Sequence, residues 1–64
     1  MFNQNVIKGE IAYHNGKLLE LKERWKYCAN KGDMRGCMIA ACNMTKHRAR
    51  LRELKPIAHK LGVE

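Results

Sequence analysis

The 64-residue chain lacks a hydrophobic run long enough to cross a membrane. Its longest apolar stretch, residues 37–42, is far shorter than the roughly 20 residues that a spanning helix needs. Residues 1–10 contain no basic segment followed by an apolar one, which is the pattern of a secretory signal. We therefore expect no membrane partner and a cytoplasmic protein.

The chain also lacks the residues of a catalytic site. Asp and Glu number only six and are scattered, and no Gly-rich phosphate-binding loop is present. No Ser/His/Asp or Cys/His arrangement can be assembled, and so short a chain does not form a water-excluding pocket by itself. We expect a protein that is not an enzyme and that needs no cofactor.

A complete disulfide framework is excluded as well, because the three cysteines are an odd number. Cys and His are the usual ligands of zinc, and the chain offers Cys28, Cys37, Cys42 and His47. Their spacing, however, is not that of a zinc finger. The last three are five residues apart, so successive members point about 140° apart on one helix. We expect reduced cysteines that pack as small hydrophobic residues, with a zinc-stapled structural module as a remaining alternative.

The first half of the chain contains a seam, which is a line of residues at helical spacing along one side of a predicted helix. The seam is apolar except at His14. Seam residues recur at alternating steps of four and three, which is the heptad pattern of packed helices: Ile7, Ile11, His14, Leu18, Leu21, Trp25 and Cys28. The pattern predicts a helix over residues 6–30. Asn15-Gly16 is a strong hairpin-turn pair, so an extended segment over residues 6–14 is the alternative. We prefer the continuous helix because the seam stays in phase through this pair.

A second seam follows a predicted turn at residues 31–33. Gly32 suits the left-handed end of one helix, and Asp33 suits the N-cap of the next. The second seam consists of Cys37, Ala40, Met44, His47, Leu51, Leu54, Ala58 and Leu61. Pro56 disfavours helical geometry at the residue before it, so we expect the second helix to cover residues 34–55 and to stop or kink there. A short final helix over residues 57–61 and a terminator at Gly62 are predicted after it.

Packing the two seams together predicts an all-α, antiparallel two-helix hairpin that forms a single domain over residues 1–64. The pairing places Cys28 opposite Cys37, the large Trp25 opposite the small Ala40, and Ile7 near the end of the second helix. The predicted core comprises Ile7, Ile11, Leu18, Leu21, Trp25, Ala40, Met44, Leu51 and Leu54.

Several apolar residues lie beside the seams and stay uncovered in a lone hairpin: Tyr13, Leu19, Ala29, Met34, Met38, Ile39 and Ala41. A chain of this length buries a modest fraction of its surface, so it gains stability from a partner. We expect a homodimer that forms a four-helix bundle.

The strongest functional feature is the excess of cations. Thirteen Lys and Arg against six Asp and Glu give a formal charge of +7, which favours an anionic partner. The densest cluster is Lys46, Arg48, Arg50, Arg52 and Lys55. Helical periodicity places Arg48, Arg52 and Lys55 on one stripe beside the seam, and Lys46 and Arg50 on its far side. We expect Glu10 to lie near Lys55, and Glu20 near Lys46 or Arg48.

These features favour a small basic protein that contacts the phosphate backbone of nucleic acid through the second helix. Aromatic residues are absent from the basic cluster, which argues against base stacking. The alternative is a modulator of the kind found on phages and mobile elements, which binds an acidic host protein through its apolar surface and basic rim. His14 and His47 occupy neighbouring positions along the two seams, where they either fix the register or respond to metal or pH.

Overall fold

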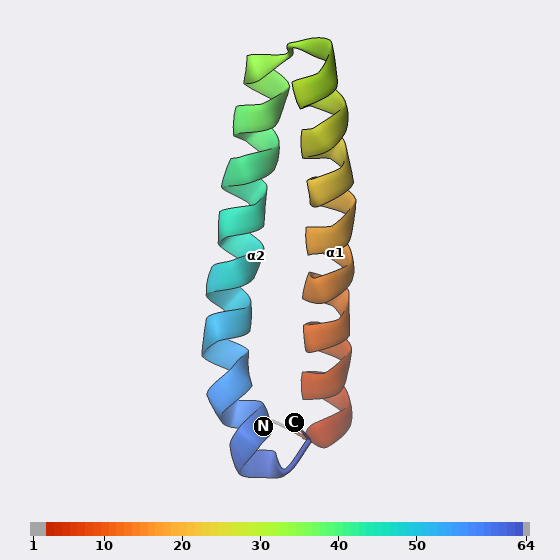
Figure 1. The fold of residues 1–64 in the computed structure, drawn as a ribbon. Helices are drawn as coiled ribbons and strands as arrows, with labels where there is room; N and C mark the ends of the chain where they lie inside the picture. The colour runs from red at the N-terminus through yellow and green to blue at the C-terminus, as the bar shows by residue number, and fades with distance from the viewer. Residues whose placement is uncertain (1–2, 64) are drawn as a thin grey trace.

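The computed structural model describes residues 3–63, so Met1, Phe2 and Glu64 lie outside the described part. It contains the helices α1 (Gln4–Lys31) and α2 (Met34–Leu61), which run antiparallel beside each other (Figure 1). The molecule is 43 Å long and 16 by 14 Å across. The predicted helical hairpin is confirmed. Helix α1 runs unbroken through Asn15 and Gly16, so the extended alternative for its first half is wrong.

The turn between the helices has the predicted chemistry. Gly32 adopts the left-handed conformation (φ 75°), and its amide donates to the carbonyl of Ala29. The next amide, that of Asp33, donates to the carbonyl of Cys28 at 2.8 Å, which closes the helix end. The Asp33 carboxylate then accepts from the Gly36 amide at 2.9 Å and caps α2. Two adjacent residues thus end one helix and begin the other.

Helix α2 does not stop at Pro56, and the prediction of a separate short helix is wrong. Proline removes one amide donor, the one that would reach the Arg52 carbonyl, while packing holds the following turns in place. Ile57 and Leu61 pack against the buried cluster at the open end, and Gly62 (φ 73°) ends the helix as predicted. In Figure 1 these last turns curve toward the beginning of α1.

The core is concentrated at the two ends of the hairpin. At the open end Ile7, Leu54 and Ala58 are fully buried. At the turn end the buried residues are small: Cys28, Cys37 and Ala40. Between them Leu51 is buried, whereas Leu18, Leu21 and Met44 are only half-buried. The middle of the hairpin is therefore the less tightly packed part.

Trp25 differs from its predicted place in the core. Its side chain is 42% exposed, whereas Ala40, its predicted partner, is 1% exposed. With helices packed closely enough to bury an alanine, the larger indole extends beyond the interface. The predicted pairing of Trp25 with the small Ala40 overestimated the burial of the indole.

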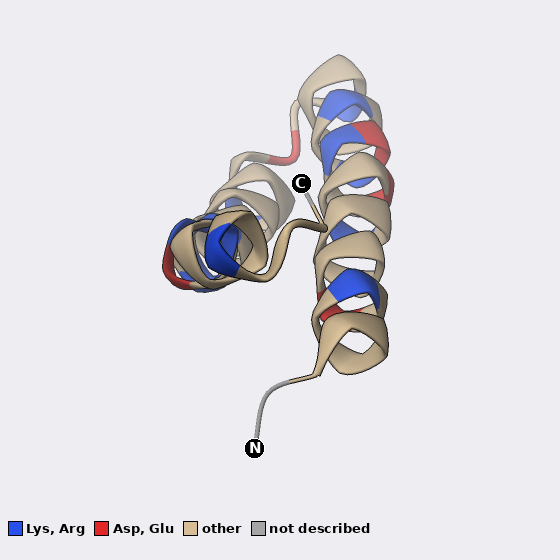
Figure 2. Ribbon diagram, turned by 90° about the horizontal axis from the view of Figure 1, so that it is seen from below, with Lys and Arg blue, Asp and Glu red and all other residues tan. Residues whose placement is uncertain are grey.

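Lys and Arg occur along both helices, as the view from the open end shows (Figure 2). In the described part neither helix has a stretch sufficiently long and apolar to span a membrane.

Candidate nucleic-acid interface

One long face of the hairpin has hollows that are lined by cations and by no carboxylate of the described residues. It has three adjoining hollows of about 360, 400 and 490 Å³, and no Asp or Glu of residues 3–63 lines them. We call this surface the acid-free face. Its lining residues are Asn15, Leu18, Leu19, Lys22, Met44, Arg48, Leu51, Arg52, Lys55, Pro56 and His59.

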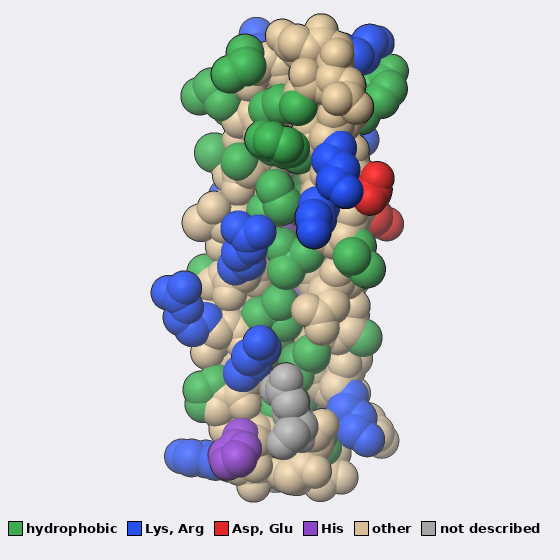
Figure 3. Space-filling view, viewed as in Figure 1, with side chains coloured by type: hydrophobic (Ala, Val, Ile, Leu, Met, Phe, Trp, Pro, Cys, Tyr) green, Lys and Arg blue, Asp and Glu red, His purple; other side chains and the backbone are tan. Residues whose placement is uncertain are grey.

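Helical spacing explains why the cations gather on this face. Arg48, Arg52 and Lys55 are separated by four and three residues, so they form one stripe along α2. Lys22 of α1 lines the same hollow as Arg48, with Leu18 and Met44 between them. Figure 3 shows the resulting surface, in which hydrophobic side chains follow the middle, Lys and Arg lie on either side, and Asp and Glu are seen only at one edge.

The opposite surface, which we call the mixed-charge face, has two hollows of about 570 and 590 Å³ that share Arg24. Their other lining residues are Tyr13, Lys17, Glu20, Leu21, Glu23, Tyr27, Cys28, Asp33, Gly36, Ile39, Asn43 and His47. Cations and carboxylates pair here. Arg50, one heptad after Asn43, binds Glu10 at 3.2 Å and Glu53 at 3.0 Å. Lys17 lies 3.4 Å from Glu20.

These ion pairs correct two predictions. Glu10 forms its ion pair with Arg50 and not with Lys55, and Glu20 forms its ion pair with Lys17. The reason is that a residue beside a seam can meet only partners on its own side of the interface. Hydrogen bonds to Glu53 and then Glu10 raise the pKa of Arg50, so this guanidinium stays charged. Its charge is already opposed by two carboxylates.

The five cations predicted as one site are consequently divided. Arg48, Arg52 and Lys55 line the acid-free face together. Arg50 belongs to the ion pairs of the mixed-charge face, and Lys46, one heptad after Ile39, projects on that side too.

Lys22 was missed because it lies in the other helix, far from the basic cluster in sequence. A usable pattern was present. Lys22 directly follows the seam residue Leu21, as Arg48 directly follows the seam residue His47. In an antiparallel hairpin such positions of the two helices flank the same side of the interface, and the structure brings both into one hollow.

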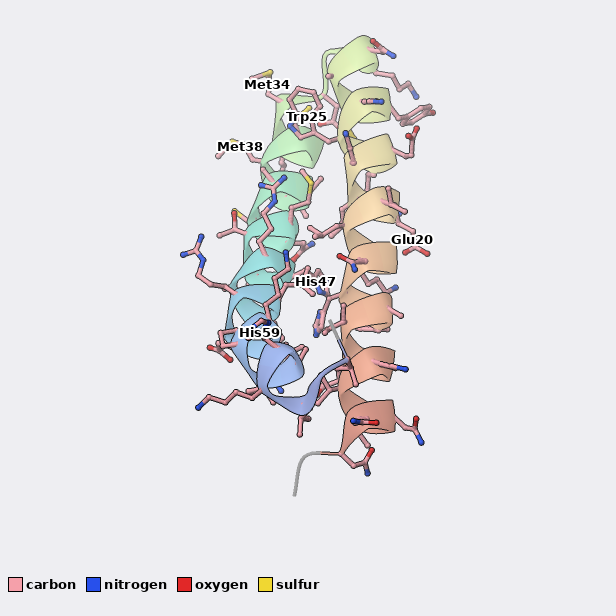
Figure 4. The ribbon with its side chains drawn as sticks, turned by 60° about the horizontal axis from the view of Figure 1, so that its bottom comes forward. Glu20, Trp25, Met34, Met38, His47 and His59 are labelled. Atoms are coloured by element: carbon pink, nitrogen blue, oxygen red, sulfur yellow. The ribbon has the colours of Figure 1, made fainter. Side chains whose placement is uncertain are left out.

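The two seam histidines contact each other. The Nδ1 atoms of His14 and His47 are 2.7 Å apart, and the Tyr13 ring packs edge-on against both. Because one nitrogen must donate and the other accept, at least one ring is neutral in this arrangement. Figure 4 shows His47 pointing between the helices, whereas Glu20 projects outward from α1. The pair joins the helices in the thinly packed middle.

The candidate zinc ligands do not converge. Cys28 and Cys37 are buried near the turn, whereas Cys42 is exposed. Burial raises the pKa of the Cys37 thiol, and the nearby Cys28 and Asp33 add to this effect. Among residues 3–63, no three His, Cys, Asp or Glu side chains form a group that could hold a metal ion.

No protein-family model, curated protein or solved structure matches the chain.

Proposed function

We propose that this protein binds the phosphate backbone of nucleic acid through Lys22, Arg48, Arg52 and Lys55 of the acid-free face. The observation that supports this role most strongly is the segregation of charge. The carboxylates that could neutralise these cations line the opposite face or bind other residues there. A phosphate entering these hollows meets cations and no carboxylate of the described residues, which favours binding of a polyanion.

The side chains suit backbone contact and no sequence readout. Arg48 and Arg52 offer planar forks that fit phosphate oxygens, and lysines add point charges. None of the residues lining the acid-free hollows is a Phe, Tyr or Trp, so a platform for stacking bases is missing there. The proposed role is binding without catalysis and with little preference for sequence.

Self-association is part of the proposal. Ile7 and Leu54 are the only large side chains among the described residues that are fully buried, while Tyr13, Tyr27, Met34, Met38 and Ile39 are exposed. A hairpin with so small a core gains stability when a second copy covers its apolar surface. We propose a homodimer.

The salt dependence of duplex binding tests the proposed function. Four neutralised phosphates predict a log–log slope of affinity against salt near −3.6, since each contributes about −0.9. The double variant R48A/R52A should weaken binding and make the slope shallower by about 1.8. Fluorescence anisotropy of a labelled duplex, titrated at several salt concentrations, measures both quantities.

The matched control is K46A/K60A, which removes the same charge from exposed positions outside the acid-free hollows. It should leave the slope near the wild-type value. A flat salt response, or equal losses in the two double variants, would contradict nucleic-acid binding at this face. Capture of one stoichiometric acidic protein that survives nuclease treatment would support the alternative role as a modulator of such a protein.

A further inference from the structure

We infer that a second copy of this chain docks on the mixed-charge face, so that the dimer carries two outward acid-free faces and bridges two nucleic-acid segments. The bridging step rests on the proposed function, whereas the choice of docking face does not. The mixed-charge face has the two largest hollows described above, of about 570 and 590 Å³. Exposed Tyr13, Tyr27 and Ile39 border them.

Charge decides which face a second copy can use. A twofold interface brings the same surface patch of both copies together, so that the patch must complement itself. Two acid-free faces would set Lys22, Arg48, Arg52 and Lys55 against identical cations, which is repulsive. The mixed-charge face presents carboxylates and cations together, so it can offer each copy the opposite charge.

A twofold axis perpendicular to the long axis of the hairpin sets how the two copies meet. It places the open end of one copy, which carries Glu10, Arg50 and Glu53, against the turn end of the other. On the mixed-charge face the turn end carries Glu23, Arg24 and Asp33, so both ends present a cation together with carboxylates. The resulting antiparallel four-helix bundle buries Tyr27 and Ile39 of both copies.

The available area reaches the lower limit for such a dimer when the whole face is covered. The extents of the molecule, 43 by 14–16 Å, give a face of roughly 600 Å² per copy, and about 1,200 Å² in total is the lower bound of specific interfaces. Docking at this face leaves the acid-free faces on opposite sides of the bundle. One dimer therefore presents two separated phosphate-binding surfaces, and each holds a different segment.

Sedimentation equilibrium of the 64-residue chain tests the docking face. Ile39 is 53% exposed and lines the mixed-charge face, whereas its neighbour Met38 is 65% exposed and lies one helical position away, outside those hollows. Ile39→Glu should weaken dimerisation at least tenfold, because it buries a charge in the interface. Met38→Glu makes the same chemical change and should alter dimerisation less than about threefold. Circular dichroism checks that both variants remain helical.

A duplex fixed on beads and a second, labelled duplex in solution test bridging. The wild-type protein should retain the labelled duplex on the beads. Ile39→Glu should abolish this retention while still binding a single duplex. A wild-type monomer, or a dimer broken by Met38→Glu and kept by Ile39→Glu, would overturn the docking face.

The two failures can be told apart. A dimer that binds single duplexes but never joins two would overturn bridging while leaving the proposed function intact. A dimer that binds no duplex would overturn both bridging and the proposed function, although the interface between copies would stand.

Discussion

The acid-free face and the mixed-charge face are formed by the same two helices, and both carry Lys and Arg. They differ in whether a carboxylate lies within reach. On the mixed-charge face Arg50 is held between Glu10 and Glu53. Two residues further along α2, Arg52 lines a hollow without any carboxylate from the described residues. Neighbouring arginines of one helix thus have different surroundings, because about 100° of rotation per residue separates their sides.

This difference shows that net charge alone describes the protein poorly. A formal charge of +7 spread evenly would give a generally soluble basic surface. The arrangement instead leaves one side of the rod uncompensated and the other nearly balanced. The following experiments disturb each side separately.

The largest expected difference is in the free energy of unfolding of two glycine variants. One of them changes Gly36, which lines the mixed-charge face near the turn. A Cβ added at Gly36 would lie 2.6 Å from Cys28 Sγ and 2.5 Å from Asp33 Oδ2, so the α2 cap must shift. Gly36→Ala should lower the free energy of unfolding by about 1–2 kcal/mol. Gly16→Ala meets nothing within 4 Å and should raise it by about 0.5–1 kcal/mol. Urea denaturation measures both, and shifts in the same direction would refute the close approach.

A second experiment makes the two faces more alike. E10Q/E53Q removes both carboxylates from Arg50 and leaves a second unopposed cation cluster. Duplex affinity, measured at concentrations where the chain is monomeric and this face is open, should rise about tenfold, with a steeper salt slope. The control E20Q/E23Q adds the same net charge but releases Lys17 and Lys26 instead of Arg50. An equal gain from both variants would mean that overall charge, not its arrangement, sets affinity.

The smallest effects separate Arg50 from Arg52. Arg50→Ala should lower the free energy of unfolding by about 0.5–1 kcal/mol, a modest amount because its side chain is 42% exposed and its ion pairs are screened. Arg52→Ala should change stability by less than about 0.5 kcal/mol. Duplex affinity should show the opposite order, with the loss confined to Arg52→Ala. Thermal unfolding and anisotropy on the same preparations compare the pair.

The hairpin could be predicted from the sequence because its separate local features agree with one another. The two seams, the left-handed glycine and the capping aspartate all placed the turn at the same residues, and the structure confirms it. Pro56 misled because its local preference is overridden by packing: Ile57 and Leu61 hold the helix on the buried cluster. Packing against residues that are distant in the sequence cannot be predicted from the few residues around Pro56.

The candidate site was less predictable for a geometrical reason. Residue spacing predicts that Arg48, Arg52 and Lys55 form one stripe. The ion pairs were predicted from the position of each residue along the hairpin axis, and this position does not say on which side of the helix interface the residue lies. Glu10 was therefore assigned to Lys55 instead of Arg50. Lys22 could have been found by following the heptad positions of α1 across the interface.

The concentration of buried residues at the two ends has a consequence for motion. An isolated helix frays from its ends inward, but here the ends are fixed by the turn and by the cluster around Ile7. The more loosely packed middle, joined by the His14–His47 contact, is where the helices separate with least loss of contacts. Lys22 and Arg48 lie on different helices beside this middle. A small change in helix separation there would alter the spacing between these two charges, and under the proposed function we expect it to let one face fit backbones of different groove width.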